Sequence, residues 1–132
     1  MRKFTFKRIL HFQNITEKEI KDLSEHGHFI SCHTYSHPSL GHKYKLDFLI
    51  KEIKLAKQSL EKLIGKSNSF FCLPYGTPED CVDLNFDLFI DSKIEFLFKC
   101  YPCEPETVKS LNILGRKSVF MNHQLKDLAE YL

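Results

Sequence analysis

Two histidines lie four residues apart in the segment His33-Thr34-Tyr35-Ser36-His37-Pro38. Imidazole nitrogens are common ligands of divalent transition metals, and two of them at this spacing can chelate one ion. Pro38 disfavours a helical conformation at His37, so a turn would have to fold the second ring back beside the first. The spacing permits a metal site without requiring it, because one ring could pack in the interior while the other is solvated.

A second candidate for chemistry is the CxxC pair Cys100-Tyr101-Pro102-Cys103, which could be redox-active or half of a zinc site. The pair follows a predicted strand, whereas in thioredoxin-like proteins it opens a helix. The chain has five cysteines, an odd number, and no export signal, which fits reduced thiols better than a disulfide framework. We therefore expect ordinary buried and loop cysteines here.

The elements before the histidines are predicted by local signals. Thr16 and Glu19 have the spacing of a capping box, and the helix that they begin should end at Gly27. Residues 29–32 are then predicted to form a short buried strand. His33 would lie at the C-terminal end of this strand, which in α/β folds faces the functional crevice.

The rest of the chain alternates between the two kinds of element. Apolar residues at helical spacing predict a helix over 46–64, and a second buried strand over 70–73 runs into the turn Pro74-Tyr75-Gly76. Further along we expect a helix over 78–92, a strand over 94–100, a loop rich in proline and glutamate, a strand over 118–121 and a helix from Asn122. This alternation predicts parallel strands joined by crossover helices, hence an α/β layer or part of a barrel. Residues 1–132 should form a single domain.

Charge and hydropathy argue against two kinds of partner. Nineteen basic residues face seventeen acidic ones and are scattered among them, so nucleic-acid binding is not expected. No apolar segment approaches membrane-spanning length, and lysines and an arginine interrupt the N-terminal region where a signal peptide would need an apolar run. The sequence as written predicts a cytoplasmic product, although a longer parent protein could be exported.

The stretch SEHGHFISCHTYSHPSL (24–40) resembles the second motif of the polysaccharide deacetylase family, also called the NodB homology domain. In that motif, two histidines flank a serine or threonine and precede a hydrophobic residue or proline. LEKLIG (60–65) and FFCLPYG (70–76) are similar to the family's next helix and third motif, and LGR (114–116) more weakly resembles its end. The resemblance covers about residues 12–132.

The resemblance implies a deformed (β/α) barrel that binds a divalent metal, with zinc the expected ion, through one aspartate and two histidines. His33 and His37 match those histidines. The implied reaction removes the acetyl group from an acetylated glycan or oligosaccharide and leaves acetate and a free amine. The backbone N–H of Tyr75 would stabilise the oxyanion, which makes Tyr75 the candidate catalytic residue. Candidate substrate contacts are Tyr35, Pro74, Tyr75 and Arg116.

The sequence departs from the family pattern in two places. The family's first motif, threonine-phenylalanine-aspartate-aspartate-glycine, supplies the metal-binding aspartate and the catalytic base, and nothing before His33 matches it. Asp22, the only aspartate in that region, lies inside a predicted helix. Cys72 and Leu73 stand where many members have arginine and proline. We therefore expect a partial barrel without its N-terminal strands, an incomplete metal site and little or no activity for this chain alone.

Two other possibilities follow from the missing aspartates. The chain could be a non-catalytic deacetylase remnant that binds carbohydrate or a partner protein. Alternatively, another chain could supply the first motif. A domain without its first strands would expose a sheet edge and apolar surface, which favours a homo-oligomer.

Overall fold

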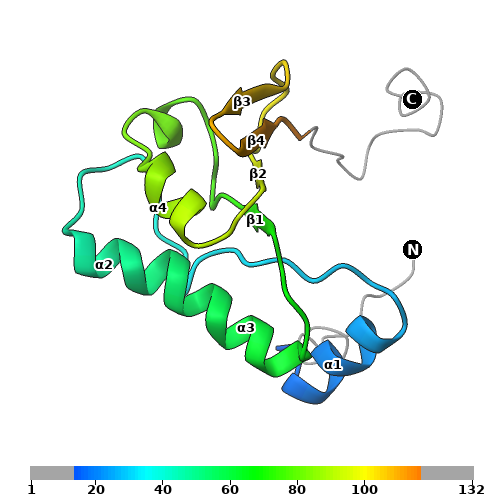
Figure 1. Ribbon diagram of the computed structural model, residues 1–132. Coiled ribbons are helices and arrows are strands. Elements are labelled where there is room, and N and C mark those ends of the chain that lie inside the picture. The colour runs from blue at the N-terminus through cyan, green and yellow to red at the C-terminus, as the bar shows by residue number, and fades with distance from the viewer. Residues whose placement is uncertain (1–13, 117–132) are drawn as a thin grey trace, which may run out of the picture.

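The computed structural model describes residues 14–116, in which a small sheet lies beside one long helix and several shorter ones (Figure 1). In chain order the elements are α1 (Glu17–Glu25), α2 (Leu46–Ile50), η2 (Lys51–Leu55), α3 (Ala56–Ile64), β1 (Phe70–Cys72), η3 (Glu79–Cys81), α4 (Phe86–Asp91), β2 (Phe96–Phe98), β3 (Glu106–Val108) and β4 (Leu111–Leu114). η2 is π-helical and η3 is a 3-10 helix. Among these described residues, no helix has both the length and the apolar character that crossing a membrane requires.

The predicted capping box begins α1. The Thr16 hydroxyl accepts a hydrogen bond from the Glu19 backbone N–H at 3.2 Å, and the Glu19 carboxylate accepts one from the Thr16 N–H at 2.7 Å. The two bonds satisfy backbone N–H groups that a helix N-terminus otherwise leaves unpaired. The chain leaves the helix through Gly27, at a φ of 88°.

The predicted helix over 46–64 is confirmed, and α2, η2 and α3 form one continuous rod (Figure 1). It ends at Gly65, which adopts the left-handed conformation and donates its N–H to the Glu61 carbonyl at 2.9 Å. Hydropathy did not predict the π-helical turn η2 in the middle. A π-helix is wound more widely than an α-helix and is rare outside single turns. This turn buries two consecutive residues, Glu52 and Ile53.

The four strands of the described region form one sheet in the order β1-β2-β4-β3. β1 is parallel to β2 and β2 to β4, whereas β3 joins β4 as an antiparallel hairpin. Cys32 adds an isolated parallel bridge to Phe71 on the other side of β1. Helical segments connect Cys32 to β1 and β1 to β2, whereas β3 lies between β2 and β4. The α/β prediction is confirmed, and the open sheet fits a partial barrel.

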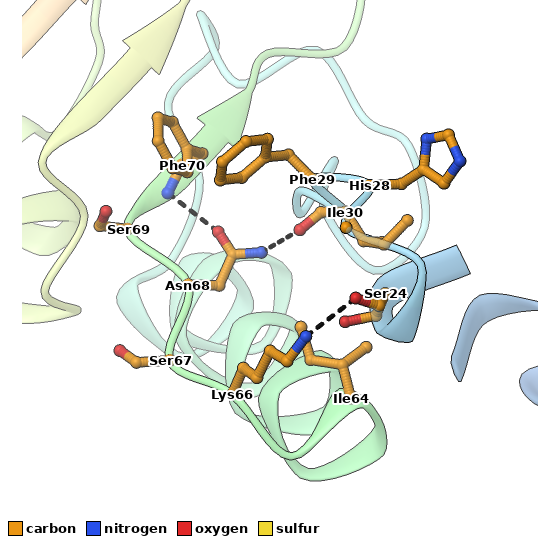
Figure 2. Close-up of a pocket in the computed structure, with 11 residues that line it drawn as sticks. Ser24, His28, Phe29, Ile30, Ile64, Lys66, Ser67, Asn68, Ser69 and Phe70 are labelled. Atoms are coloured by element: carbon orange, nitrogen blue, oxygen red, sulfur yellow. Dashed lines mark hydrogen bonds between the residues drawn. The ribbon is translucent and has the colours of Figure 1, made fainter. Parts of the chain in front are cut away.

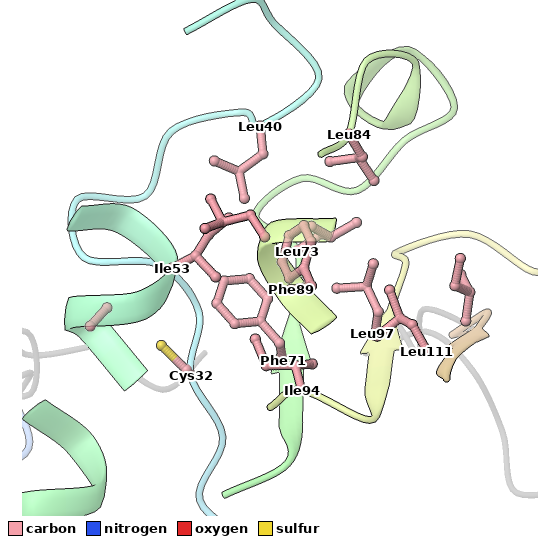
Figure 3. Packing of buried hydrophobic residues seen from close by; sticks show 13 residues of the cluster. Cys32, Leu40, Ile53, Phe71, Leu73, Leu84, Phe89, Ile94, Leu97 and Leu111 are labelled. Atoms are coloured by element: carbon pink, nitrogen blue, oxygen red, sulfur yellow. The ribbon is translucent and has the colours of Figure 1, made fainter. Parts of the chain in front are cut away.

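The core forms where the three parallel strands are in register. Phe71, Leu97 and Ile113 occupy neighbouring central positions of β1, β2 and β4, and none of the three is exposed to solvent. Ile53 from η2 and Phe89 from α4 pack into the same cluster (Figure 3). The rings of Phe71 and Phe89 meet edge to face with their centroids 5.2 Å apart, a favourable aromatic geometry.

Several predicted elements were wrong or incomplete. The strand expected over 29–32 is reduced to the bridge at Cys32, because no described strand pairs along its outer edge. The helix expected over 78–92 is broken into η3 and α4, since the Asn85 side chain caps a new helix by accepting the Leu88 N–H at 3.1 Å. The hairpin β3–β4 falls where a loop was expected. The strand over 118–121 and the helix from Asn122 lie outside the described residues.

Candidate functional site

His33 is held against the end of β1. The bridge from Cys32 to Phe71 places it there, and the Cys72 N–H donates to the Cys32 carbonyl at 2.9 Å. The Nδ1 atom of His33 lies 2.8 Å from the Cys72 carbonyl oxygen, 39 residues away in sequence. A carbonyl oxygen only accepts hydrogen bonds, so Nδ1 must carry the proton. The lone pair of the neutral ring is then on Nε2, which is the nitrogen left to bind a metal.

The turn expected between the two histidines is present. Thr34 and His37 both adopt left-handed conformations, at φ of 67° and 60°, and the His37 N–H donates to the Thr34 hydroxyl at 3.0 Å. This brings the His33 and His37 rings together, with centroids 4.8 Å apart. Left-handed φ is strained for a β-branched residue such as threonine. Strain of this kind concentrates at functional sites, where the surrounding structure maintains it.

The turn after β1 reaches the same place. The ring of Tyr75 lies with its centroid 4.9 Å from that of His37. Tyr75 has a φ of 56°, and the Gly76 N–H donates to the Pro74 carbonyl across it at 2.5 Å, which makes a tight three-residue turn. Among residues 14–116 the backbone N–H of Tyr75 has no acceptor. Pro74 is buried, and its contact with substrate stays a prediction.

A buried glutamate supports the histidine turn from the long helix. Glu52 of η2 is 1% exposed. Its Oε2 accepts the backbone N–H groups of Tyr35 at 2.9 Å and Ser36 at 2.8 Å, and its Oε1 accepts the Ser36 hydroxyl at 2.7 Å. Glu52 was not predicted from the sequence. The available signal was a charged residue next to Ile53 within the apolar stripe of the helix.

Asp80 ties the histidine loop to the tyrosine loop. Its carboxylate accepts a hydrogen bond from the Ser39 hydroxyl, and it also accepts the Thr77 N–H at 3.1 Å and the Thr77 hydroxyl at 2.8 Å. Burial raises the pKa of Asp80, but the hydrogen bonds from Ser39 and Thr77 outweigh it and lower the pKa below its ordinary value. Close approach is possible because Gly41 has no side chain: a Cβ there would lie 2.3 Å from the Asp80 carbonyl.

Arg116 lies behind the tyrosine turn. Its Nε donates to the Lys99 carbonyl at 3.0 Å, and its Nη2 lies 2.7 Å from the sulfur of Cys100. The Cys100 N–H in turn donates to the Gly76 carbonyl at 3.0 Å. Arg116 therefore has an indirect connection to the turn that carries Tyr75, through Cys100, which contacts both Arg116 and Gly76. Its contact with substrate stays a prediction.

Tyr35 is at the surface of the histidine turn. Its side chain is 63% exposed, and the Lys51 ammonium lies 4.7 Å from the centre of its ring. A cation over one face of an aromatic ring is a favourable contact, and it occupies that face. A stacking role for Tyr35 on a sugar would therefore use the other face or displace the lysine, and it stays a prediction.

The cysteines do not build a competing metal centre in the described region. All five are free thiols. Burial raises the pKa of Cys81 to about 11, and burial also raises the pKa of Cys32, so both thiols stay protonated at neutral pH and are poor ligands. Within residues 14–116, no three histidine, cysteine or acidic side chains are grouped so that they could hold a metal ion. Metal binding by His33 and His37 stays a prediction.

The hollow in Figure 2 is separate from this site. It has a volume of about 300 Å³ and lies between the end of α1, the end of α3 and the start of β1. Lys66 closes one side by donating to the Ser24 carbonyl at 2.8 Å, and Asn68 bridges the Ile30 carbonyl and the Phe70 N–H. None of the predicted site residues lines it. The histidines and Tyr75 gather at the opposite end of β1.

Comparisons with known proteins concern the family and the fold of this chain. A model of the polysaccharide deacetylase family matches residues 3–86. The Streptococcus pyogenes deacetylase PplD in complex with acetate superimposes with a TM-score of 0.73 at 18% identity, over 93% of this chain and 53% of that one. A polysaccharide deacetylase from Bacillus cereus gives 0.71 at 21% identity, over 91% of this chain and 37% of that one. A de-N-acetylase from Aggregatibacter actinomycetemcomitans gives 0.69 at 15% identity, over 89% of this chain and 53% of that one.

The chain thus spans about half the length of these solved structures, or less. At such identities the superpositions establish a shared fold. No curated protein sequence matches the chain. The family match extends over more than half of the residues and includes the histidine turn and the Tyr75 turn. The chain belongs to the polysaccharide deacetylase family.

Proposed function

We propose that this chain carries the histidine pair and the oxyanion-binding turn of a metal-dependent carbohydrate N-deacetylase. The observation that carries the proposal is the convergence of His33, His37 and Tyr75, whose successive ring centroids are 4.8 Å and 4.9 Å apart. These residues come from two loops that only the fold brings together. Deacetylases of this family act on acetylated carbohydrate and generally depend on a metal, which favours an acetamido sugar as the substrate.

Each residue has a role that its surroundings support. His33 and His37 would hold a divalent ion, and neutral imidazoles suit zinc. Such an ion, when bound, supplies Lewis-acid polarisation and lowers the pKa of water. The Cys72 carbonyl holds His33 in the tautomer that presents Nε2 outward. The Tyr75 N–H, without an acceptor among the described residues, would donate to the oxygen that becomes negative as the acetamide is attacked.

Two components of the complete reaction are missing from residues 14–116. No third metal ligand joins the histidines there, and no carboxylate stands beside them as a general base. We therefore infer weak metal binding and little or no hydrolysis for this chain alone. A segment carrying the missing carboxylates would restore both. The second candidate function, a non-catalytic domain that binds carbohydrate or a partner protein, is favoured by the same shortage of carboxylates.

Zinc titration followed through the imidazole signals in NMR tests the proposal. We expect the His33 and His37 rings to respond together, and His33→Ala and His37→Ala each to weaken binding at least tenfold. His28→Ala, which removes an exposed histidine outside the site, should leave binding unchanged. Equal zinc binding by the wild type and the His33→Ala/His37→Ala double variant would exclude this site. Acetate release from acetylated chito-oligosaccharides would then separate an active chain from a purely binding one.

A further inference from the structure

Glu52 is a buried carboxylate that the proposed chemistry leaves unused. It is 1% exposed, and the three ion pairs among residues 14–116 do not include it. Burying an ionised carboxylate without partners is costly, so a buried one is expected to be hydrogen-bonded. All the hydrogen bonds that Glu52 accepts within this region come from one place, the turn between the two histidines.

The position of these donors matters. Tyr35 and Ser36 are the middle residues of the turn, and His33 and His37 lie on either side of them. One carboxylate oxygen accepts two successive backbone N–H groups and the other accepts the Ser36 hydroxyl, so the contact fixes both the path and the rotation of the chain there. Hydrogen bonds to an ionised group are about twice as strong as those between neutral groups.

The turn needs such support. Thr34 and His37 are non-glycine residues with left-handed backbones, at φ of 67° and 60°, and conformations of this kind persist only when their surroundings hold them. Without the carboxylate, the turn could relax to a commoner conformation. The His37 ring would then move away from His33, because the turn brings the two rings together.

The helix geometry brings the carboxylate to the turn. Glu52 lies in the π-helical segment η2, where it and its neighbour Ile53 are both buried. A π-helical turn has more residues than an α-helical one, so it changes the direction in which the following side chains point. Within this turn, Ile53 packs in the core while Glu52 reaches the loop. π-helical turns within α-helices occur frequently at functional sites.

We propose that Glu52 is a positioning residue that holds His33 and His37 in the arrangement that binds the metal. This inference rests on the proposed function for the identity of the ligand, but not for the geometry of the turn. Glu52 acts through the backbone of Tyr35 and Ser36, with no contact to the imidazoles themselves.

The test compares Glu52→Gln with Glu61→Gln in the full chain. Glu61 is a matched control, because it lies on the same rod, accepts the Asn68 N–H at 2.8 Å and pairs with Lys57 at 2.6 Å, away from the turn. Glutamine at 52 keeps one accepting oxygen, which can serve the Tyr35 and Ser36 N–H groups, turns an NH₂ group toward the Ser36 hydroxyl and removes the charge from the acceptor. We expect at least tenfold weaker zinc binding at the imidazoles in Glu52→Gln, and unchanged zinc binding in Glu61→Gln.

A second measurement, hydrogen exchange, tests the role of Glu52 without a metal. Hydrogen exchange of the Tyr35 and Ser36 amides should accelerate at least tenfold in Glu52→Gln relative to amides of the β1–β2 ladder, whereas Glu61→Gln should leave that ratio unchanged. A purely structural role of Glu52 would accelerate all of these amides alike. If Glu52→Gln does not fold, Ser36→Ala can replace it, because it removes a single hydrogen bond to the carboxylate. Ser36→Ala should weaken zinc binding and accelerate exchange of the turn amides, each by a smaller factor.

The outcomes separate the two proposals. Zinc binding and amide protection equal to wild type in a folded Glu52→Gln variant would overturn the positioning role. If wild type itself shows no zinc response at the imidazoles, the proposed function fails and the exchange ratio alone decides the inference. Selective loss of Tyr35 and Ser36 protection then supports it, and retained or uniformly lost protection overturns it.

Discussion

Asp80→Asn should weaken the connection between the two loops of the site. The wild-type carboxylate accepts three hydrogen bonds, from the Ser39 hydroxyl and from the N–H and hydroxyl of Thr77. Asparagine keeps one accepting oxygen, which can serve Thr77, and turns an NH₂ group toward Ser39. The charge assistance in all three bonds is lost. Hydrogen bonds to charged groups contribute about 1.5–3 kcal/mol when buried and less when partly exposed, so we expect a loss of about 1–2 kcal/mol at pH 7.

Unfolding in urea measures this difference, with Asp83→Asn as the control. Asp83 is exposed and three residues away, and its substitution should change stability by less than about 0.5 kcal/mol. For a chain of this size, the loss at Asp80 corresponds to a fall in Tm of about 3–8 °C. The same preparations report whether the His37 and Tyr75 rings stay in contact, through nuclear Overhauser effects between them.

The pH dependence gives the sharpest check. The folded pKa of Asp80 is lowered, so its ionised form contributes stability at pH values above the unfolded pKa of about 3.9. That contribution disappears as the pH falls through the lower, folded pKa. The gap between wild type and Asp80→Asn should therefore be full at pH 7 and should narrow as the pH drops below about 4. A gap of the same size at pH 7 and pH 3, or no gap at pH 7, would refute the reasoning.

Two further substitutions test the frame around the site. Phe71→Ala should destabilise the protein by about 3–5 kcal/mol in urea unfolding, because it leaves a cavity at a position that is 0% exposed. Val82→Ala, at an exposed position, is the control and should have little effect. Similar losses of stability in the two variants would contradict the assigned core. Gly76→Ala should lower the free energy of unfolding by more than about 1 kcal/mol in the same assay, since Gly76 has a φ of 63° and an added Cβ would lie 2.7 Å from the Cys100 nitrogen. Unchanged stability of this variant would contradict the described turn.

Much of the fold could be predicted from local sequence patterns. The capping box of Thr16 and Glu19, the amphipathic helix over 46–64 and its stop at Gly65 depend on residues close together in the chain, and all three are confirmed. The parallel α/β arrangement followed from the alternation of elements. The hairpin β3–β4 was missed because strands of three and four residues carry little periodicity, and because the pairing of β4 with β2 joins segments that are distant in sequence.

Part of the candidate site could likewise be predicted from local motifs, and part of it could not. The spacing of His33 and His37 and the turn after β1 were visible as local motifs, and they indicated both the family and the chemistry. Their convergence was not visible, because it depends on the Cys32–Phe71 bridge and on a hydrogen bond between residues 39 positions apart. Glu52 and Asp80 were missed for the same reason: a carboxylate in a sequence does not reveal which backbone N–H groups it will meet. Motifs are local properties of the chain, whereas hydrogen-bond partners distant in sequence are settled only when the helices and strands pack.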